Sequence, residues 1–242
     1  MIQAILWGGL AGSSLVLGAI LGIYKNIPNK VSAFIMAYGT GVLIGAATFE
    51  LLTDAVRDGG ILYPSIGFLL GALAFIIAEL LIMRKGGHER KRSKVSPAGH
   101  SGLAIFIGSI MDAIPESTII GVSLLEGHSV SWVIIIAIFV SNFPEGLSSS
   151  IGMKKDGYSK KKILSLWLIV MLLSSVSSLL GYVLIDVSSL ILITTIGAFA
   201  AGGIFAMVSS TMLPEAFEEG GPLVGFISAL GLLTALILTY YG

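Results

Sequence analysis

The sequence contains no cysteine among its 242 residues and carries little charge. The absence of cysteine excludes disulfides, thiolate metal ligands and cysteine nucleophiles. Charged residues make up only 12% of the chain, about half the share of a soluble protein, whereas hydrophobic residues make up 55%. A soluble fold could not cover its surface with so few charges, so the composition indicates a membrane protein. The 14 basic and 14 acidic residues balance, so the net charge gives no reason to expect nucleic acid as a partner.

Eight apolar stretches are long enough to cross a lipid bilayer as helices, since a span needs about 20 mostly apolar residues. They cover residues 2–24, 31–56, 61–83, 102–125, 129–152, 163–185, 189–217 and 222–241. The apolar runs are continuous rather than alternating, which favours helices over barrel strands. The sequence therefore predicts an all-α membrane protein with eight transmembrane helices. Residues 1–242 are expected to form a single transmembrane domain with a flexible loop at about 84–101.

The positions of the basic residues predict the orientation of the bundle. All of them except Arg57 lie in the loops between spans 1 and 2, 3 and 4, or 5 and 6. Because cytoplasmic loops are the positive ones, both termini are expected to be extracellular. No basic residue precedes the first apolar run, which favours a retained first helix over a cleaved signal peptide. The short loops and the absence of a targeting segment suit the plasma membrane of a bacterium.

Two pairs of spans resemble each other. Phe49–Gly60 (FELLTDAVRDGG) at the end of span 2 matches Ser210–Gly221 (STMLPEAFEEGG) at the end of span 7 at a constant offset. Spans 4 and 5 also resemble each other, because Asp112–Glu116 (DAIPE) lines up with Ser141–Glu145 (SNFPE) and both end in Pro-Glu. The members of each pair run in opposite directions, which predicts an inverted 3+2+3 repeat, with spans 1–3 against 6–8 and spans 4 and 5 central. Transporters built in this way hold substrate near the midplane. The alternative is that Gly-Gly and Pro-Glu simply recur at helix ends.

Five acidic residues lie inside the predicted spans: Glu50, Glu79, Asp112, Glu116 and Glu145. No lysine or arginine lies at a comparable depth to neutralise them. A carboxylate near the centre of a bilayer costs several kcal/mol. These groups are therefore expected either to stay protonated or to meet a cation that comes and goes.

Spans 4 and 5 carry the candidate binding residues. Asp112 and Glu116 are four residues apart and share one helix face, and Ser141 and Glu145 repeat that spacing beside Asn142. These five side chains would supply the oxygen ligands that a divalent cation prefers. The alternative is a pair of protonated acids in a hydrogen-bond network between the helices.

A proline precedes each of the two glutamates. Because proline has no N–H, Pro115 and Pro144 leave the carbonyl four residues back without its helical partner. These carbonyls belong to Met111 and Val140. We expect each kink to open polar backbone next to a carboxylate.

At this point the chain resembles the ZIP (Zrt/Irt-like) family of divalent metal transporters. The similarity rests on the eight spans, the basic loop between spans 3 and 4, and the motifs DAIPESTIIG (Asp112–Gly121) and SNFPEGLSSSIG (Ser141–Gly152). It implies that Glu116 and Glu145 are metal-binding glutamates and that Asn142 is the second polar ligand. Asp112 and Ser141 would hold the first position of each motif. The resemblance also implies a homodimer in which spans 4 and 5 move relative to a scaffold.

Span 4 departs from the family pattern at three positions. Asp112 stands where histidine is usual, Ala113 where asparagine is usual, and Ser117 where glycine is usual. Ala113 cannot bind a metal, and span 6 has only serines at depth, so we expect one metal rather than two. Replacing imidazole by carboxylate makes the site harder, so Mn²⁺, Fe²⁺ or Cd²⁺ become alternatives to Zn²⁺.

The expected function is uptake of a divalent metal cation into the cytoplasm by alternating access, with the metal as substrate and no cofactor required. Glu50, Asp54 and Glu79 are candidates for the transport path. No P-loop or His-Glu-x-x-His motif occurs, so neither ATP-driven transport nor an intramembrane metalloprotease is expected, and the chain is not predicted to be an enzyme. Two alternatives stay open: a ZIP-fold protein that binds or senses metal without transport, and a proton-coupled carrier of small solutes.

Overall fold

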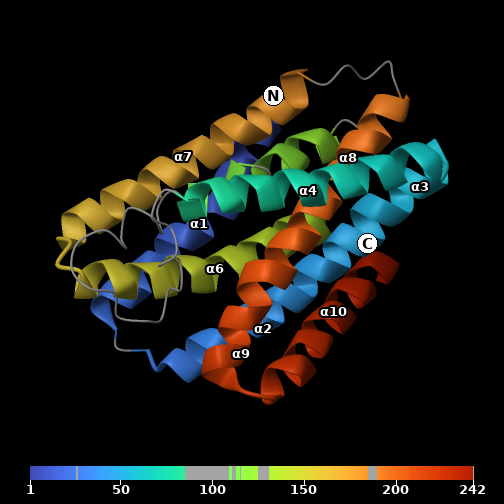
Figure 1. The fold of residues 1–242 in the computed structure, drawn as a ribbon. Helices are drawn as coiled ribbons and strands as arrows, with labels where there is room; N and C mark the ends of the chain where they lie inside the picture. The colour runs from blue at the N-terminus through green and yellow to red at the C-terminus, as the bar shows by residue number, and fades with distance from the viewer. Residues whose placement is uncertain are drawn as a thin grey trace.

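The structure is a computed structural model that describes residues 1–25, 27–84, 109–110, 113–114, 116–124, 131–184 and 190–241. Throughout these residues the regular structure is helical (Figure 1). The helices are α1 (Ile2–Tyr24), α2 (Asn29–Ala46), α3 (Thr53–Gly59), α4 (Leu62–Arg84), α6 (Trp132–Lys155), α7 (Lys160–Leu184), α8 (Leu190–Met207), α9 (Leu213–Gly220) and α10 (Leu223–Tyr241). Two π-helical segments, η1 (Ala47–Leu52) and η3 (Val208–Met212), join α2 to α3 and α8 to α9. The prediction of an all-helical protein is confirmed for the described residues.

Seven of the predicted spans are present as helices long and apolar enough to cross a membrane. Their ends lie within three residues of the predicted ones; the stretch predicted at 31–56, for example, runs as Asn29–Gly59. The predicted span at 102–125 falls partly outside the described residues, and its described residues 109–110, 113–114 and 116–124 are helical. The predicted loop at about 84–101 lies almost entirely outside them.

Two lysines that flank the connection between α6 and α7 contact the end of α1 at one end of the bundle. Lys154 Nζ donates a hydrogen bond to the carbonyl of Ile23 at 2.9 Å, and Lys160 Nζ lies 4.7 Å from the ring centroid of Tyr24. These contacts join the end of α1 to the end of α6 and the start of α7. We call this the basic end of the bundle.

Both chain termini lie at the opposite end. The ring of Trp7 in α1 packs edge-on against Trp132 at the start of α6, with centroids 4.8 Å apart. Ser131, which caps α6, and Thr239 in α10 both donate hydrogen bonds to the carboxylate of Glu50. The first and last helices therefore share the end away from the lysines (Figure 1).

The internal repeat is present in the backbone. α2, η1 and α4 begin at residues 29, 47 and 62, and α8, η3 and α10 begin at residues 190, 208 and 223, each 161 positions later (190 − 29 = 161). The helix after each π-segment ends at a glycine with positive φ, 72° at Gly60 and 70° at Gly221. Two π-segments at equivalent positions are not expected by chance, because such segments are rare.

The two copies run in opposite directions. Asn29 Nδ2 at the start of α2 donates a hydrogen bond to Glu219 Oε2 at the end of α9, at 3.3 Å. At the other end, Gly59 of α3 packs against Thr194 of α8. The first copy thus begins beside the place where the second copy ends, which is the arrangement of an inverted repeat.

Close helix contacts in the two halves also match. A Cβ atom at Gly41 of α2 would meet the carbonyl of Ser228 in α10, and one at the equivalent Gly202 of α8 would meet the carbonyl of Phe68 in α4. Glycine allows these backbones to touch, as in other membrane helix pairs. In this way α2 of the first copy packs against α10 of the second copy, and α8 of the second copy packs against α4 of the first.

Candidate functional site

The candidate ligands that the structure describes are all buried. Ser141, Asn142 and Glu145 on α6 are 1%, 3% and 4% exposed, and Glu116 on the helix of span 4 is 2% exposed. In a helix that crosses a membrane, a glutamate at such a position faces the interior of the bundle rather than lipid. These four side chains are therefore placed in the interior of the bundle, and their binding of a metal stays a prediction.

Two apolar clusters bracket these glutamates along the helices. One cluster joins Ala113 of span 4 to Met153 of α6, and the other joins Ile119 of span 4 to Ile138 of α6. On both helices the glutamate falls between the two cluster members. Along its own helix, each glutamate therefore lies between a residue of one apolar cluster and a residue of the other.

The hydroxyl of Ser141 is oriented by its own helix. Ser141 Oγ donates a hydrogen bond to the carbonyl of Ile138 at 3.1 Å. This bond uses the only proton of the hydroxyl, so the oxygen lone pairs are left to accept a hydrogen bond or to bind a cation. Ser141 and Glu145 are one helical turn apart on the same face, as the sequence predicted.

Pro144 lies inside α6, which continues without interruption from Trp132 to Lys155. The backbone of α2 approaches α6 at the residue whose helical partner the proline lacks. A Cβ atom at Gly39 of α2 would lie 3.0 Å from the carbonyl oxygen of Val140. That carbonyl, expected to face a bound cation, lies against Gly39, so we do not count it among the candidate ligands.

Asp112, Pro115 and Met111 lie outside the described residues. Among the described residues, no group of three or more His, Cys, Asp or Glu side chains is arranged to hold a metal ion. The described part of the candidate site consists of two carboxylates, one amide and one hydroxyl. Asp112 stays a predicted fifth ligand.

The three candidates for the transport path lie at different places. Glu50 in η1 accepts hydrogen bonds from Ser131 Oγ at 2.8 Å and Thr239 Oγ1 at 2.7 Å. Asp54 in α3 forms an ion pair with Arg57 at 3.1 Å. Glu79 in α4 accepts a hydrogen bond from Ser210 of η3 at 3.1 Å.

Glu50 and Glu79 have a structural relationship that the sequence did not reveal. One hydrogen bond joins Thr239 of α10 to Glu50 of η1. The other joins Ser210 of η3 to Glu79 of α4. Glu50 is the acceptor within η1, whereas Glu79 lies on α4 and accepts from η3. Both residues tie a π-segment to a neighbouring helix.

Comparison with curated proteins identifies a distant relative in Arabidopsis thaliana that is named "Putative zinc transporter" and is 26% identical over 209 residues. The match covers 85% of this chain and 33% of the plant protein, so the chain spans about a third of the length of that relative. No family model matches the chain. Because the similarity extends over most of the chain, it indicates a distant relationship to a protein named as a metal transporter rather than a shared short motif.

Proposed function

We propose that this protein transports a divalent metal cation, Zn²⁺ or a similar ion such as Mn²⁺, Fe²⁺ or Cd²⁺, into the cytoplasm by alternating access. The central site is formed by Glu116, Ser141, Asn142 and Glu145, together with Asp112. The observation that carries the proposal is the burial of both Glu116 and Glu145, at 2% and 4% exposed, within two helices of a membrane protein. Such carboxylates are costly in a membrane unless a proton or a cation is supplied.

The architecture supports a transporter. Inverted repeats with interrupted helices are typical of secondary transporters, in which one part of the bundle rocks against another around a central site. Here the repeat comprises α2 to α4 and α8 to α10, and both copies contain a π-segment at the same position. Spans 4 and 5 lie between the copies in the sequence and carry the candidate ligands.

The basic end supports an orientation of the protein in the membrane as part of the proposal. Loops rich in lysine face the cytoplasm, so we place the basic end there and both termini outside the cell. Glu50 and Asp54 then lie toward the extracellular side. A plasma-membrane location and a homodimer are parts of the same proposal, taken from the resemblance to the ZIP family.

The distant relationship to a plant protein named as a zinc transporter supports Zn²⁺ as the first ion to test. The ligands here are oxygen atoms only, which suits Mn²⁺ and Fe²⁺ at least as well. Selectivity between these ions is therefore part of the experiment.

The direct test is metal uptake by proteoliposomes that contain the purified protein. We expect uptake of at least one of Zn²⁺, Mn²⁺, Fe²⁺ and Cd²⁺, and a loss of at least tenfold in Glu116→Ala and in Glu145→Ala. The matched control is Ser150→Ala, which removes a buried hydroxyl from the same helix and leaves both carboxylates in place.

Each alternative gives a different result. Wild-type activity of both glutamate variants toward every ion would refute the site. Tight binding of metal without flux would identify a binding or sensing protein, and competition by small organic solutes instead of metals would identify a solute carrier.

A further inference from the structure

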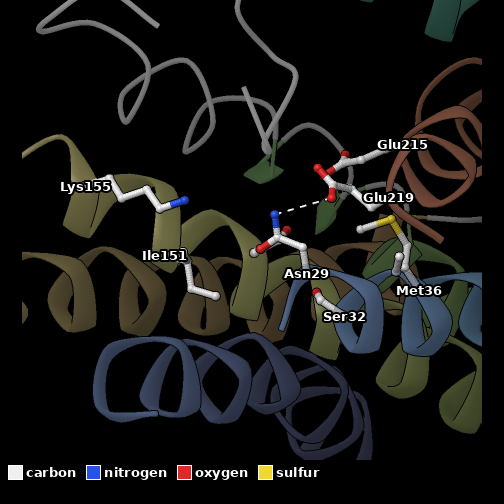
Figure 2. A pocket seen from close by; sticks show the side chains of 9 residues that line it. Asn29, Ser32, Met36, Ile151, Lys155, Glu215 and Glu219 are labelled. Atoms are coloured by element: carbon white, nitrogen blue, oxygen red, sulfur yellow. Dashed lines mark hydrogen bonds between the residues drawn. The ribbon is translucent and has the colours of Figure 1, made fainter. Parts of the chain in front are cut away.

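A small cavity lies at the basic end of the bundle, away from the proposed central site. It is bounded by the start of α2, the end of α6 and α9, and offers about 30 Å³ to the centres of water-sized molecules. That volume is enough for a cation or one to two waters. Its polar and sulfur-bearing walls come from Asn29, Ser32, Met36, Lys155, Glu215 and Glu219 (Figure 2).

Two carboxylates of α9 face this cavity. Glu215 and Glu219 are four residues apart and share one helix face, and their carboxyl groups lie side by side above Asn29 in Figure 2. Asn29 Nδ2 donates a hydrogen bond to Glu219 Oε2 at 3.3 Å. The remaining carboxylate lone pairs and the amide oxygen are the ligand types that divalent cations prefer.

A buried hydroxyl in the cavity wall points to a ligand as well. Ser32 of α2 is only 6% exposed, and its Oγ is buried with no hydrogen-bond partner within the described part of the chain. Figure 2 shows this oxygen directed from α2 toward Asn29 and the cavity. Buried polar groups are normally satisfied, so an unpartnered hydroxyl next to two carboxylates indicates that something else binds there.

The internal repeat provides a comparison at the opposite end. Asp54 and Asp58 of α3 are the equivalents of the two cavity glutamates, again 161 positions apart. Both aspartates bind Arg57, with Arg57 Nη1 3.1 Å from Asp54 and Arg57 Nε 3.1 Å from Asp58. The residue equivalent to Arg57 in α9 is Glu218. The helix of one copy thus carries an arginine between its two acids, and the helix of the other carries a third acid at that position.

Among the described residues that line the cavity, the basic group comes from a different helix. Lys155 ends α6 and extends its ammonium group toward the cavity in Figure 2. Its long side chain lets the charge approach the two glutamates or withdraw toward solvent. An ammonium group in this position competes with any metal ion for the same carboxylates.

We propose that this cavity is a second divalent-cation site, held by Glu215, Glu219 and the Ser32 hydroxyl, and that Lys155 weakens it by competing for the carboxylates. Cation binding in the cavity does not depend on the proposed transport function. A role of this site as the last binding site of the ion before the cytoplasm does rest on the proposed transport function. A competing lysine suits that role, since it favours release of the ion over retention.

The test is equilibrium dialysis of the purified full-length protein against Cd²⁺, which binds both oxygen and sulfur ligands and so also probes Met36. The background is Asp112→Asn with Glu116→Gln and Glu145→Gln, which removes the three central carboxylates and leaves the cavity. We expect this background to bind one Cd²⁺, and Glu215→Gln with Glu219→Gln to abolish that binding. Glu218→Gln on the same helix does not line the cavity and is the matched control.

A second variant tests the lysine and does not require any ligand to be removed. Lys155→Gln should tighten Cd²⁺ binding by about 3- to 10-fold, as expected for a charge at the protein surface. No Cd²⁺ binding in the background protein, or unchanged binding after loss of both cavity glutamates, would overturn the proposal. Unchanged affinity in Lys155→Gln would overturn the competition.

These results are separate from those for the central site. If the protein binds Cd²⁺ in the cavity but takes up no metal, the proposed transport function is refuted and the cavity site stands. If the protein takes up metal but binds no Cd²⁺ in the cavity, the cavity site is refuted and the transport function stands.

Discussion

Asp54 of α3 and Glu215 of α9 occupy equivalent positions in the two halves of the molecule, each in the first turn of the helix that follows a π-segment. Arg57 lies 3.1 Å from Asp54, whereas Glu218 stands at the place equivalent to Arg57 beside Glu215. The backbones of the two ends repeat, but their charges differ. The acidic pair of α3 therefore has an arginine of its own helix beside it, whereas the pair of α9 has a third acid at that position.

Removing the arginine should give the two ends the same cation-binding property. In Arg57→Gln, Asp54 and Asp58 lose their partner, and we expect one additional weakly bound Cd²⁺ per chain in equilibrium dialysis. Arg57→Lys keeps the charge and should bind no additional ion. An equal number of bound ions in Arg57→Gln and the wild type would show that these aspartates do not form a cation site.

Close packing of α2 against α10 should be sensitive to single methyl groups. A Cβ atom at Gly231 would meet the carbonyl of Tyr38, so Gly231→Ala should lower the free energy of unfolding by about 1–3 kcal/mol. Gly225 lies on the same helix and has nothing within 4 Å of an added Cβ, so Gly225→Ala is the control. Thermal unfolding in detergent measures both, and equal midpoints would contradict the packing described.

The hydrogen bonds to Glu50 should stabilise the end of the bundle opposite the basic end. Thr239→Val removes the 2.7 Å bond to this carboxylate and should lower the free energy of unfolding by about 1.5–3 kcal/mol. Thr195→Val is the control, because Thr195 Oγ1 bonds only a carbonyl of its own helix, that of Ile191. If Glu50 acts only in the transport path, Glu50→Gln should take up less metal, and Thr239→Val should be as stable as the wild type.

The glycines that end the two repeated helices should respond alike. Gly60 and Gly221 have φ of 72° and 70°, which an L-residue adopts at a cost of about 1–2 kcal/mol. We expect Gly60→Ala and Gly221→Ala to lower stability by similar amounts, and the Asn variants to lower it less because asparagine tolerates this region. The comparison uses chemical unfolding of the four variants, and a large loss at one site alone would contradict the equivalence.

The sequence predicted most of the architecture because membrane helices obey simple rules. Long apolar runs located seven described spans, and the matched pattern that contains Asp54 and Glu215 and ends at Gly60 and Gly221 indicated the inverted repeat. Burial of Glu116 and Glu145 followed from the need to hide carboxylates from lipid. In each case the signal lies in residues that are close in sequence or repeated at a fixed distance.

The features that the sequence did not reveal depend on contacts between distant segments. Glu50 meets Ser131 and Thr239, which are 81 and 189 residues away, and no local pattern marks these pairs. The cavity at the basic end joins Lys155 of α6 to Glu219 of α9 in the same way. The carbonyl of Val140 was expected to face a cation, and the approach of Gly39 that turns it into a packing contact comes from a separate helix.

The most direct test of the central claim is anomalous X-ray scattering from crystals soaked separately in Zn²⁺, Mn²⁺ and Cd²⁺. We expect a peak between spans 4 and 5, about 2.0–2.6 Å from carboxylate oxygens of both Glu116 and Glu145. That peak should disappear in Glu145→Ala while the rest of the density is unchanged. Crystals of the wild type that show no peak between these two glutamates with any of the three ions would contradict the account.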